Sequence, residues 1–172
     1  VESALPGGFQ GCRQGVSSGF MDASPVSSSR TDPANRPIRV WKFGGTSVGD
    51  LERVRKVAGR IARQVEEGDR MVVTVSAMGR TTDRLVGMAR ELIGRPDRRE
   101  LDALLATGEQ QSTALLCLAL QALGVSARSF TGAQAGFHTS DLHGEARILE
   151  VVPERLHAAL ERVPVAVVAG FQ

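Results

Sequence analysis

The stretch VWKFGGTSV at residues 40–48 joins an apolar run directly to two glycines, and this junction decides how the rest of the chain is interpreted. Gly44 and Gly45 lack a Cβ atom, so the backbone can adopt positive φ there and its N–H groups can come close to an anion. The same turn carries polar side chains, namely Lys42, Thr46 and Ser47. The stretch predicts a strand that ends in a phosphate-binding turn, although a tight turn beside a solvent-exposed lysine fits the same residues.

A helix is predicted directly after this turn. Apolar residues recur every three or four positions from Leu51 to Val65, which is typical of one face of a helix, and this helix should end near Gly68. The N-terminus of such a helix offers unpaired N–H groups and a partial positive charge, so backbone and dipole would bind a phosphate together with Lys42. The two common phosphate-loop patterns, G-x-x-x-x-G-K-S/T and G-x-G-x-x-G, do not follow the strand.

Composition limits the classes of protein to which the chain can belong. Its 172 residues are 42% hydrophobic, so they can bury a core, and one domain is the default expectation. The balance of 21 basic and 19 acidic residues, with 4% aromatic residues, argues against a nucleic-acid surface. No apolar run approaches the length of about 18 residues that a membrane span needs. Cys12 and Cys117 lie in unlike contexts, so we expect no disulfide or metal site and a cytoplasmic setting.

Residues 1–37 are predicted to form a disordered tail ahead of the folded domain at 38–172. Gly, Ser and Pro make up sixteen of these thirty-seven residues, and no apolar period is sustained. The tail lacks the apolar segment of a secretory signal. An organelle transit peptide and an overextended start ahead of Met21 are alternative interpretations.

Strands and helices alternate along the remaining chain. Buried strands are predicted at 70–76, 127–130 and 165–169, with a short extended segment at 147–151 and a loop at 131–136. Helices are predicted at 84–94, 98–105, 107–123 and 153–162. Asp83 or Thr82 should cap the first of these, and Thr107 with Gln110 matches a capping box that would start a new helix.

This alternation predicts an α/β fold, a three-layer α/β/α sandwich with a mainly parallel sheet. Ligands of such sheets bind at the carboxyl ends of the strands, where Lys42, Ser76 and Gly170 fall. A buried strand that ends in a glycine turn normally leads into another helix, so the sheet is expected to be incomplete at its C-terminus.

Six motifs together resemble the aspartate kinases of the amino-acid kinase family, in the family's order and with comparable spacing from residue 38 to 172. The motifs are KFGGTS at 42–47, VSAMG at 75–79, LLATGEQ at 104–110, SFTGAQAG at 129–136, HGEARI at 143–148 and VAGFQ at 168–172. The resemblance covers only the N-terminal part of a kinase domain. Family members continue into an Arg-Gly-Gly-Ser-Asp segment, most of the adenine site and regulatory domains.

The resemblance implies ATP-dependent phosphorylation of the β-carboxylate of L-aspartate to 4-phospho-L-aspartate, with Mg²⁺ bridging the phosphates. This is the first step towards lysine, threonine and methionine. Such a reaction needs no general base, because a carboxylate is already a nucleophile, and should depend on positioning and on offsetting charge repulsion.

The resemblance also implies roles for individual residues. Lys42 would contact the nucleotide phosphates and neutralise charge on the transferred group. The other nucleotide-site residues would be Phe43, Gly44, Gly45 and Ser76, with Thr46 and Ser47 as additional hydroxyl donors. Thr82 and Glu109 would contact aspartate, with Glu109 facing its ammonium group. Each of these has a structural alternative: Glu109 would suit the first turn of a helix, Thr82 a helix cap and Ser76 a strand end.

Two other functions remain open at this point. A related kinase could act on glutamate or acetylglutamate, which the TGEQ and GFQ motifs disfavour. A noncatalytic module could instead bind a partner subunit through apolar surface at 115–123 and on the last strand. We expect the isolated chain to be inactive and the full-length protein to form a homo-oligomer or bind a partner subunit. The histidines, His138, His143 and His157, lack metal-ligand spacing, so no metal ligand is assigned.

Overall fold

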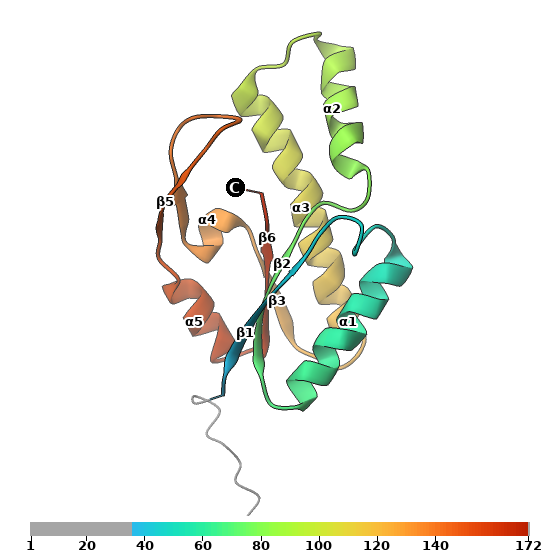
Figure 1. The fold of residues 1–172 in the computed structure, drawn as a ribbon, viewed down its shortest axis with the longest axis vertical. Helices are drawn as coiled ribbons and strands as arrows, with labels where there is room; N and C mark the ends of the chain where they lie inside the picture. Colours follow the sequence, from blue (N-terminus) through green and yellow to red (C-terminus); the bar gives the residue numbers. More distant parts are fainter. Residues whose placement is uncertain (1–35, 172) are drawn as a thin grey trace, which may run out of the picture. The chain divides into compact units, whose positions relative to one another are not determined.

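The computed structural model describes residues 36–171, so the predicted tail at 1–37 lies almost entirely outside the described residues. The elements in chain order are β1 (Ile38–Phe43), α1 (Leu51–Glu66), β2 (Arg70–Val75), α2 (Thr81–Leu92), α3 (Arg98–Gln121), β3 (Ala127–Phe130), α4 (Gly132–Ala135), β4 (Phe137–Thr139), β5 (Ile148–Val151), α5 (Glu154–Leu160) and β6 (Val165–Ala169) (Figure 1). No helix between residues 36 and 171 has the length and apolar character needed to cross a bilayer.

Four parallel strands form the central sheet in the order β1-β2-β6-β3. The predicted mainly parallel α/β sheet is therefore confirmed, and β6 occupies its interior, between β2 and β3. A separate antiparallel pair joins β4 to β5. The extended segment predicted at 147–151 is β5, whereas β4 was missed because its three residues lie in a polar stretch without apolar alternation.

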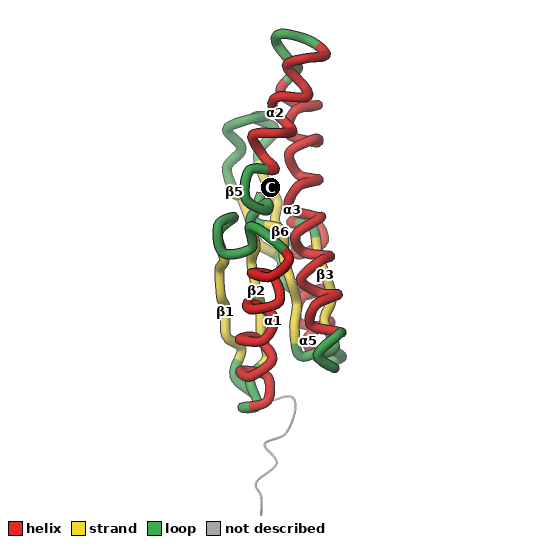
Figure 2. The backbone as a smooth tube through the Cα atoms, turned by 90° about the vertical axis from the view of Figure 1, so that its right-hand side faces the viewer, coloured by secondary structure: helices red, strands yellow, loops and turns green. Residues whose placement is uncertain are grey.

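Helices cover both faces of the sheet, as the three-layer prediction requires. In Figure 1, α1 and α3 lie on one side of the strands and α4 and α5 lie on the other. Figure 2 views the molecule from the α1 and α3 side and shows the strands behind both helices. The buried apolar residues accordingly divide into two clusters, one beneath α1 and α3 and one beneath α4 and α5.

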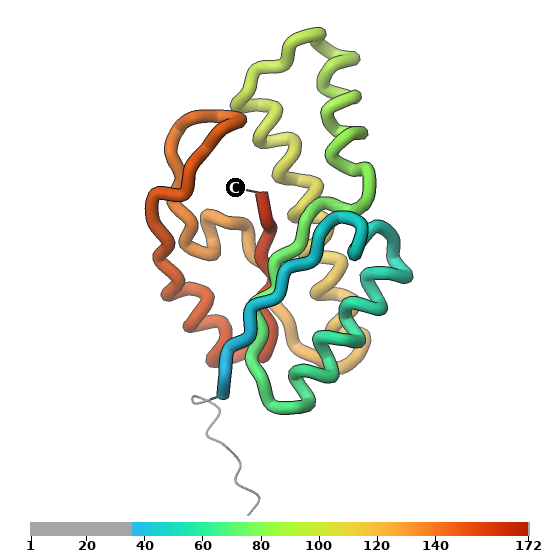
Figure 3. The backbone as a smooth tube through the Cα atoms, in the orientation of Figure 1, coloured from blue at the N-terminus to red at the C-terminus, as the bar shows by residue number. Residues whose placement is uncertain are grey.

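The larger cluster is built from alternating strand positions. In β2, Met71, Val73 and Val75 are fully buried and face α1 and α3, where they meet Ile61 and Leu116. The last strand, β6, returns the chain to the middle of the sheet, as the backbone trace in Figure 3 shows. All five residues of β6 are buried, because helices cover both of its faces. The expectation that the last strand exposes an apolar surface is therefore wrong.

Cys117 lies in this larger cluster as a core thiol, with 6% of its surface exposed. Burial in an apolar environment disfavours the charged thiolate, and it raises the pKa of Cys117 to about 12. The thiol is therefore neutral at physiological pH and acts as a small apolar side chain.

A single helix, α3, replaces the two helices predicted between residues 98 and 123. The Thr107 hydroxyl does not cap a new helix but donates to the carbonyl of Leu104 within the same helix, at 2.6 Å. A Cβ atom on Gly108 would lie 3.1 Å from Cγ2 of Thr81 and 3.3 Å from Cβ of Ala77. Gly108, within the predicted capping box, lets α3 pack closely against the start of α2 and the loop after β2.

Two other helix starts differ from the prediction. The α2 helix begins at Thr81 after Arg80, which makes no side-chain capping bond, so Thr82 and Asp83 lie in its first turn and do not cap it. A capping box does occur, at Thr131 and Gln134, where a loop was predicted. Of the two sequence patterns that match a capping box, the one at Thr131 starts a helix and the one at Thr107 lies inside α3.

We expect Gly136→Ala to lower the free energy of unfolding by at least about 2 kcal/mol. Gly136 has φ of +90°, and a Cβ atom there would overlap the carbonyl of Val152, whose N–H donates to Gly136 O at 2.8 Å. Urea denaturation followed by circular dichroism measures the change. Gly87→Ala is the matched control, since its Cβ would meet nothing within 4 Å in exposed α2, and should stabilise by roughly 0.5–1 kcal/mol. Equal effects would contradict the prediction.

Candidate functional site

Three of the sheet's strands end side by side, and the loops after them form the candidate site. Phe43, Val75 and Ala169 are register partners at the carboxyl ends of β1, β2 and β6. The N–H of Ser76 donates to Phe43 O at 3.1 Å, and the N–H of Gly170 donates to Val75 O at 3.0 Å. The structure thus brings the regions around Lys42, Ser76 and Gly170 to one edge of the sheet, where parallel α/β proteins bind ligands.

The glycine turn after β1 packs directly on the loop after β2. A Cβ atom on Gly45 would lie 2.5 Å from the carbonyl oxygen of Ala77, and the N–H of Gly79 donates to Gly45 O at 3.0 Å. Neither Gly44 nor Gly45 is among the described glycines with positive φ, so the expected left-handed conformation does not occur. Glycine is needed at 45 because two backbones approach each other there.

The turn presents donors that have no acceptor within residues 36–171. These are the N–H groups of Gly44, Gly45 and Thr46, whereas the N–H of Ser47 closes the turn onto Gly44 O at 2.9 Å. Lys42 is exposed, forms no ion pair with a described residue, and places Nζ 3.8 Å from the Cβ position of Gly44. Unpaired N–H groups and an ammonium group are typical donors to anions, and we call the residues that carry them (42 and 44–46) the β1 cradle.

The N-terminus of α1 does not contribute to this cradle as the sequence suggested. Asp50 caps the helix, its Oδ1 accepting the N–H of Arg53 at 2.8 Å. Arg53 in turn pairs with Asp50 at 3.3 Å and donates to Thr46 O at 2.6 Å. A carboxylate therefore already occupies the helix end, and its negative charge would oppose a phosphate there. Asp directly before the apolar period at Leu51 is a recognisable N-cap signal, so this residue could have been found from the sequence.

Thr46 and Ser47 line a cavity of about 310 Å³ on the α1 side of the turn. Basic residues of α1, namely Arg53, Lys56 and Arg60, line the same cavity. Arg60 lies over the rings of Trp41 and Phe43, at 5.7 and 5.8 Å from their centroids. The two hydroxyl groups therefore border a basic cavity that the sequence did not predict.

Glu109 ties two of the strand-end loops together. Its Oε1 accepts the N–H of Ala77 at 3.3 Å, after β2, and its Oε2 accepts the N–H of Phe171, after β6. Glu109 lies in the interior of α3, so the interpretation that it serves the first turn of a helix is wrong. Nothing local in the sequence marks Ala77 and Phe171 as its partners, because residues 32 and 62 positions away are brought together only by the fold.

Thr82 and Ser76 lie near this carboxylate in the fold. Thr82 is exposed in the first turn of α2, which packs on α3 where Thr81 meets Gly108, the residue before Glu109. Ser76 is half-buried at the end of β2, directly before Ala77. No group of three His, Cys, Asp or Glu side chains that could hold a metal ion occurs in the described part of the chain.

A doubly covered parallel sheet whose strand-end loops meet at one edge defines an α/β protein of the class that binds ligands at that edge. Residues 37–172 match the model of the amino acid kinase family, and the chain belongs to that family.

Several proteins of similar sequence are aspartokinases. The chain is 55% identical over 132 residues to an aspartokinase of Thermus thermophilus and 49% identical over 135 residues to one of Geobacillus stearothermophilus. These alignments cover 77% and 78% of the chain but 33% of each relative, so the chain spans about a third of their length. The predicted resemblance to aspartate kinases is confirmed.

Solved structures agree with these similarities. An aspartate kinase from Synechocystis superposes with a TM-score of 0.67 at 51% identity and covers 78% of this chain, which covers 22% of that protein. Aspartokinase III of E. coli, solved with aspartate and ADP, superposes with a TM-score of 0.63 over 79% of this chain, which covers 41% of that one. At 23% identity this second likeness shows the fold alone.

We expect Gly45→Ala to destabilise the protein by about 1–3 kcal/mol, because the added methyl group meets the backbone carbonyl of Ala77 and must separate the two loops. Gly44→Ala is the matched control, since its Cβ would have only Lys42 Nζ nearby, at 3.8 Å, and it should change stability by less than about 0.5 kcal/mol. Thermal and urea unfolding of both variants measure the difference. A Gly45→Ala protein as stable as Gly44→Ala would show that the loops separate at no cost.

Proposed function

We propose that the polypeptide carrying this sequence transfers the γ-phosphoryl group of ATP to the β-carboxylate of L-aspartate. A bond forms between the γ-phosphorus and a carboxylate oxygen, the bond from that phosphorus to the β,γ-bridging oxygen breaks, and ADP leaves with its electron pair. The products are 4-phospho-L-aspartate and ADP. The observation that carries the proposal is the β1 cradle, positive and rich in free donors, beside strand-end loops tied by a carboxylate.

The cradle supplies what this reaction needs. The attacking carboxylate and the phosphoryl oxygens are all negative, so the main barrier that a protein can lower is charge repulsion. Lys42 offers a full positive charge, and the N–H groups of Gly44, Gly45 and Thr46 offer fixed dipoles. Donors that are fixed in place before the substrate binds stabilise developing charge most effectively.

Phe43 and Ser76 would serve the nucleotide site mainly by shaping it. The ring of Phe43 is buried against Trp41 and Arg60, so Phe43 can act only through its backbone, whose carbonyl accepts the N–H of Ser76. The Ser76 side chain lies at the strand end and is free to donate to a phosphate oxygen. Mg²⁺ would enter with the nucleotide and be coordinated chiefly by phosphate oxygens and water, since the described residues offer no three-ligand group.

Glu109 and Thr82 would bind the amino acid. An ionised carboxylate has about four lone-pair positions, and the two N–H groups that Glu109 accepts leave capacity for a substrate ammonium group. Thr82 adds an exposed hydroxyl group on the helix that packs beside Glu109. The similarity to aspartokinases, one of which was solved with aspartate and ADP, supports aspartate over glutamate or acetylglutamate as the substrate.

A second candidate function, binding a partner subunit or a second copy, is favoured by an apolar groove of about 360 Å³ between α1 and α3. Leu118 and Leu123, within the region expected to expose apolar surface, are 60% and 53% exposed there. Assays with aspartate, glutamate and acetylglutamate, combined with sedimentation of the intact polypeptide, separate the two functions. A monomer that phosphorylates aspartate supports the kinase alone.

In the full-length polypeptide, we expect Lys42→Ala to reduce kcat for phosphoryl transfer by about 10³-fold or more, because it removes the cradle's only full charge. Circular dichroism should be unchanged, since Lys42 is exposed and forms no contact that holds the fold. Lys56→Ala, which removes the other lysine of the chain and its exposed pair with Glu52, is the matched control and should keep near-normal turnover. Near-normal turnover of Lys42→Ala would exclude the proposed role.

We expect Glu109→Ala to raise KM for aspartate roughly tenfold or more while KM for ATP changes less than about threefold. The variant should also lose about 1–3 kcal/mol of stability, because two backbone N–H groups lose their acceptor. The matched control is Gln110→Ala, the exposed neighbour on α3. If both Michaelis constants rise together, Glu109 holds the loops without binding aspartate.

A further inference from the structure

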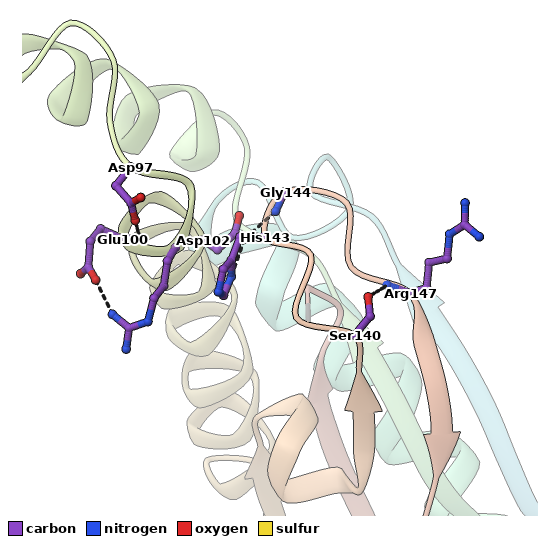
Figure 4. A network of polar contacts seen from close by, with 8 residues as sticks. Asp97, Glu100, Asp102, Ser140, His143, Gly144 and Arg147 are labelled. Atoms are coloured by element: carbon purple, nitrogen blue, oxygen red, sulfur yellow. Dashed lines mark hydrogen bonds and ion pairs between the residues drawn. The ribbon is translucent and has the colours of Figure 1, made fainter.

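One carboxylate joins the tip of the β4–β5 hairpin to helix α3. The N–H of Gly144 donates to Oδ2 of Asp102 at 2.7 Å, and Nδ1 of His143 lies 3.4 Å from the same oxygen. Figure 4 shows Asp102 reaching from α3 towards both residues of the tip. The Asp102 side chain is 22% exposed, so water screens this contact less than it screens a pair on the open surface.

The rest of the hairpin tip, residues 141–146, makes few contacts with other elements. Every residue of the tip is exposed, and its backbone hydrogen bonds run within the tip itself. Ser140 and Arg147 close its base, with the N–H of Ser140 donating to Arg147 O at 2.9 Å and the N–H of Arg147 donating to Ser140 Oγ at 3.1 Å (Figure 4). Among residues 36–171, the polar contacts from the tip to another element are those with Asp102.

The hairpin forms one wall of a cavity at the strand ends. The cavity measures about 300 Å³, at the lower limit for small-molecule sites, and lies between Asp102, the hairpin residues Gly144 and Ala146, and the residues after β6, Gly170 and Phe171. Phe171 is the residue whose N–H donates to Glu109. Figure 1 shows the C-terminal end of the described chain between the hairpin and α3.

We propose that Asp102 is a positioning residue that holds the hairpin tip in place as the outer wall of the amino-acid pocket beside Glu109. The inference rests on the proposed function, because Glu109 is assigned to aspartate there and Phe171, whose N–H it accepts, lines this cavity. A wall that is in place only part of the time lowers apparent affinity in proportion to the fraction of closed molecules. Asp102 therefore affects the affinity for aspartate through Gly144. The affinity for the nucleotide, which the β1 cradle binds, does not depend on Asp102.

If Asp102 positions the hairpin, two substitutions of it should have different effects. Asp102→Asn removes the negative charge, but the amide oxygen of the new side chain can still accept the Gly144 N–H, so this variant should keep the wall in place. Asp102→Ala removes the acceptor altogether. A residue that bound the substrate ammonium directly by charge would fail in both variants, whereas a positioning residue is rescued by asparagine.

The first test needs no substrate. Hydrogen exchange of the Gly144 amide, measured in the intact polypeptide, should be about tenfold faster in Asp102→Ala and within about threefold of wild type in Asp102→Asn. Asp141→Ala, which removes an exposed carboxylate of the hairpin that has no side-chain partner among the described residues, is the matched control and should leave Gly144 exchange unchanged. Equal exchange in wild type and Asp102→Ala would overturn the proposal.

The second test uses steady-state kinetics of the same variants. Asp102→Ala should raise KM for L-aspartate about tenfold, with kcat and KM for ATP within about threefold, and Asp102→Asn and Asp141→Ala should resemble wild type. Equal impairment of Asp102→Asn and Asp102→Ala would overturn the positioning role. A wild-type protein without aspartate kinase activity would overturn the proposed function, while the exchange measurement would still decide whether Asp102 holds the hairpin.

Discussion

The arrangement of the site depends on one carboxylate, that of Glu109, between two strand ends. Parallel strands can align their backbones in register, but the loops beyond their ends are not paired by the ladder and need other partners. Glu109 supplies an acceptor to one N–H after β2 and to one after β6, and it does so from the middle of a long helix that is itself anchored in the core. The loop after β2 then carries the Gly45 contact, so the geometry of the β1 cradle is linked to α3 through the backbone of this loop and the side chain of Glu109.

Charge is distributed unevenly around this edge of the sheet. Lys42 stands without an opposite charge among the described residues, whereas the basic residues of α1 nearest the turn are partly neutralised by Asp50 and Glu52. An unpaired cation on a rigid strand end is available to a ligand, because it has no ion pair to break first. The two sides of the glycine turn therefore differ in what they can bind, although the sequence shows only a lysine, two glycines and two hydroxyl residues.

Much of the fold could be predicted because its strands carry strong local signals. The runs at 165–169 and 70–76 are almost continuously apolar, as in strands of a covered parallel sheet, so both strands were found within one residue of their ends. The failures lie where distant contacts decide local structure. Thr107 and Gln110 match a capping box, but α2 packs against Gly108 between them and the helix continues. The family resemblance pointed to Glu109, yet its two backbone partners and the Asp102 contact join segments separated by tens of residues, which no local pattern encodes.

Burial makes Cys117 much less reactive than a free thiol. A thiol with pKa near 12 and 6% exposure is almost entirely un-ionised and shielded, so thiol reagents reach it only when the core between α1, α3 and the sheet opens. The rate at which Cys117 is alkylated therefore measures how often this part of the core opens.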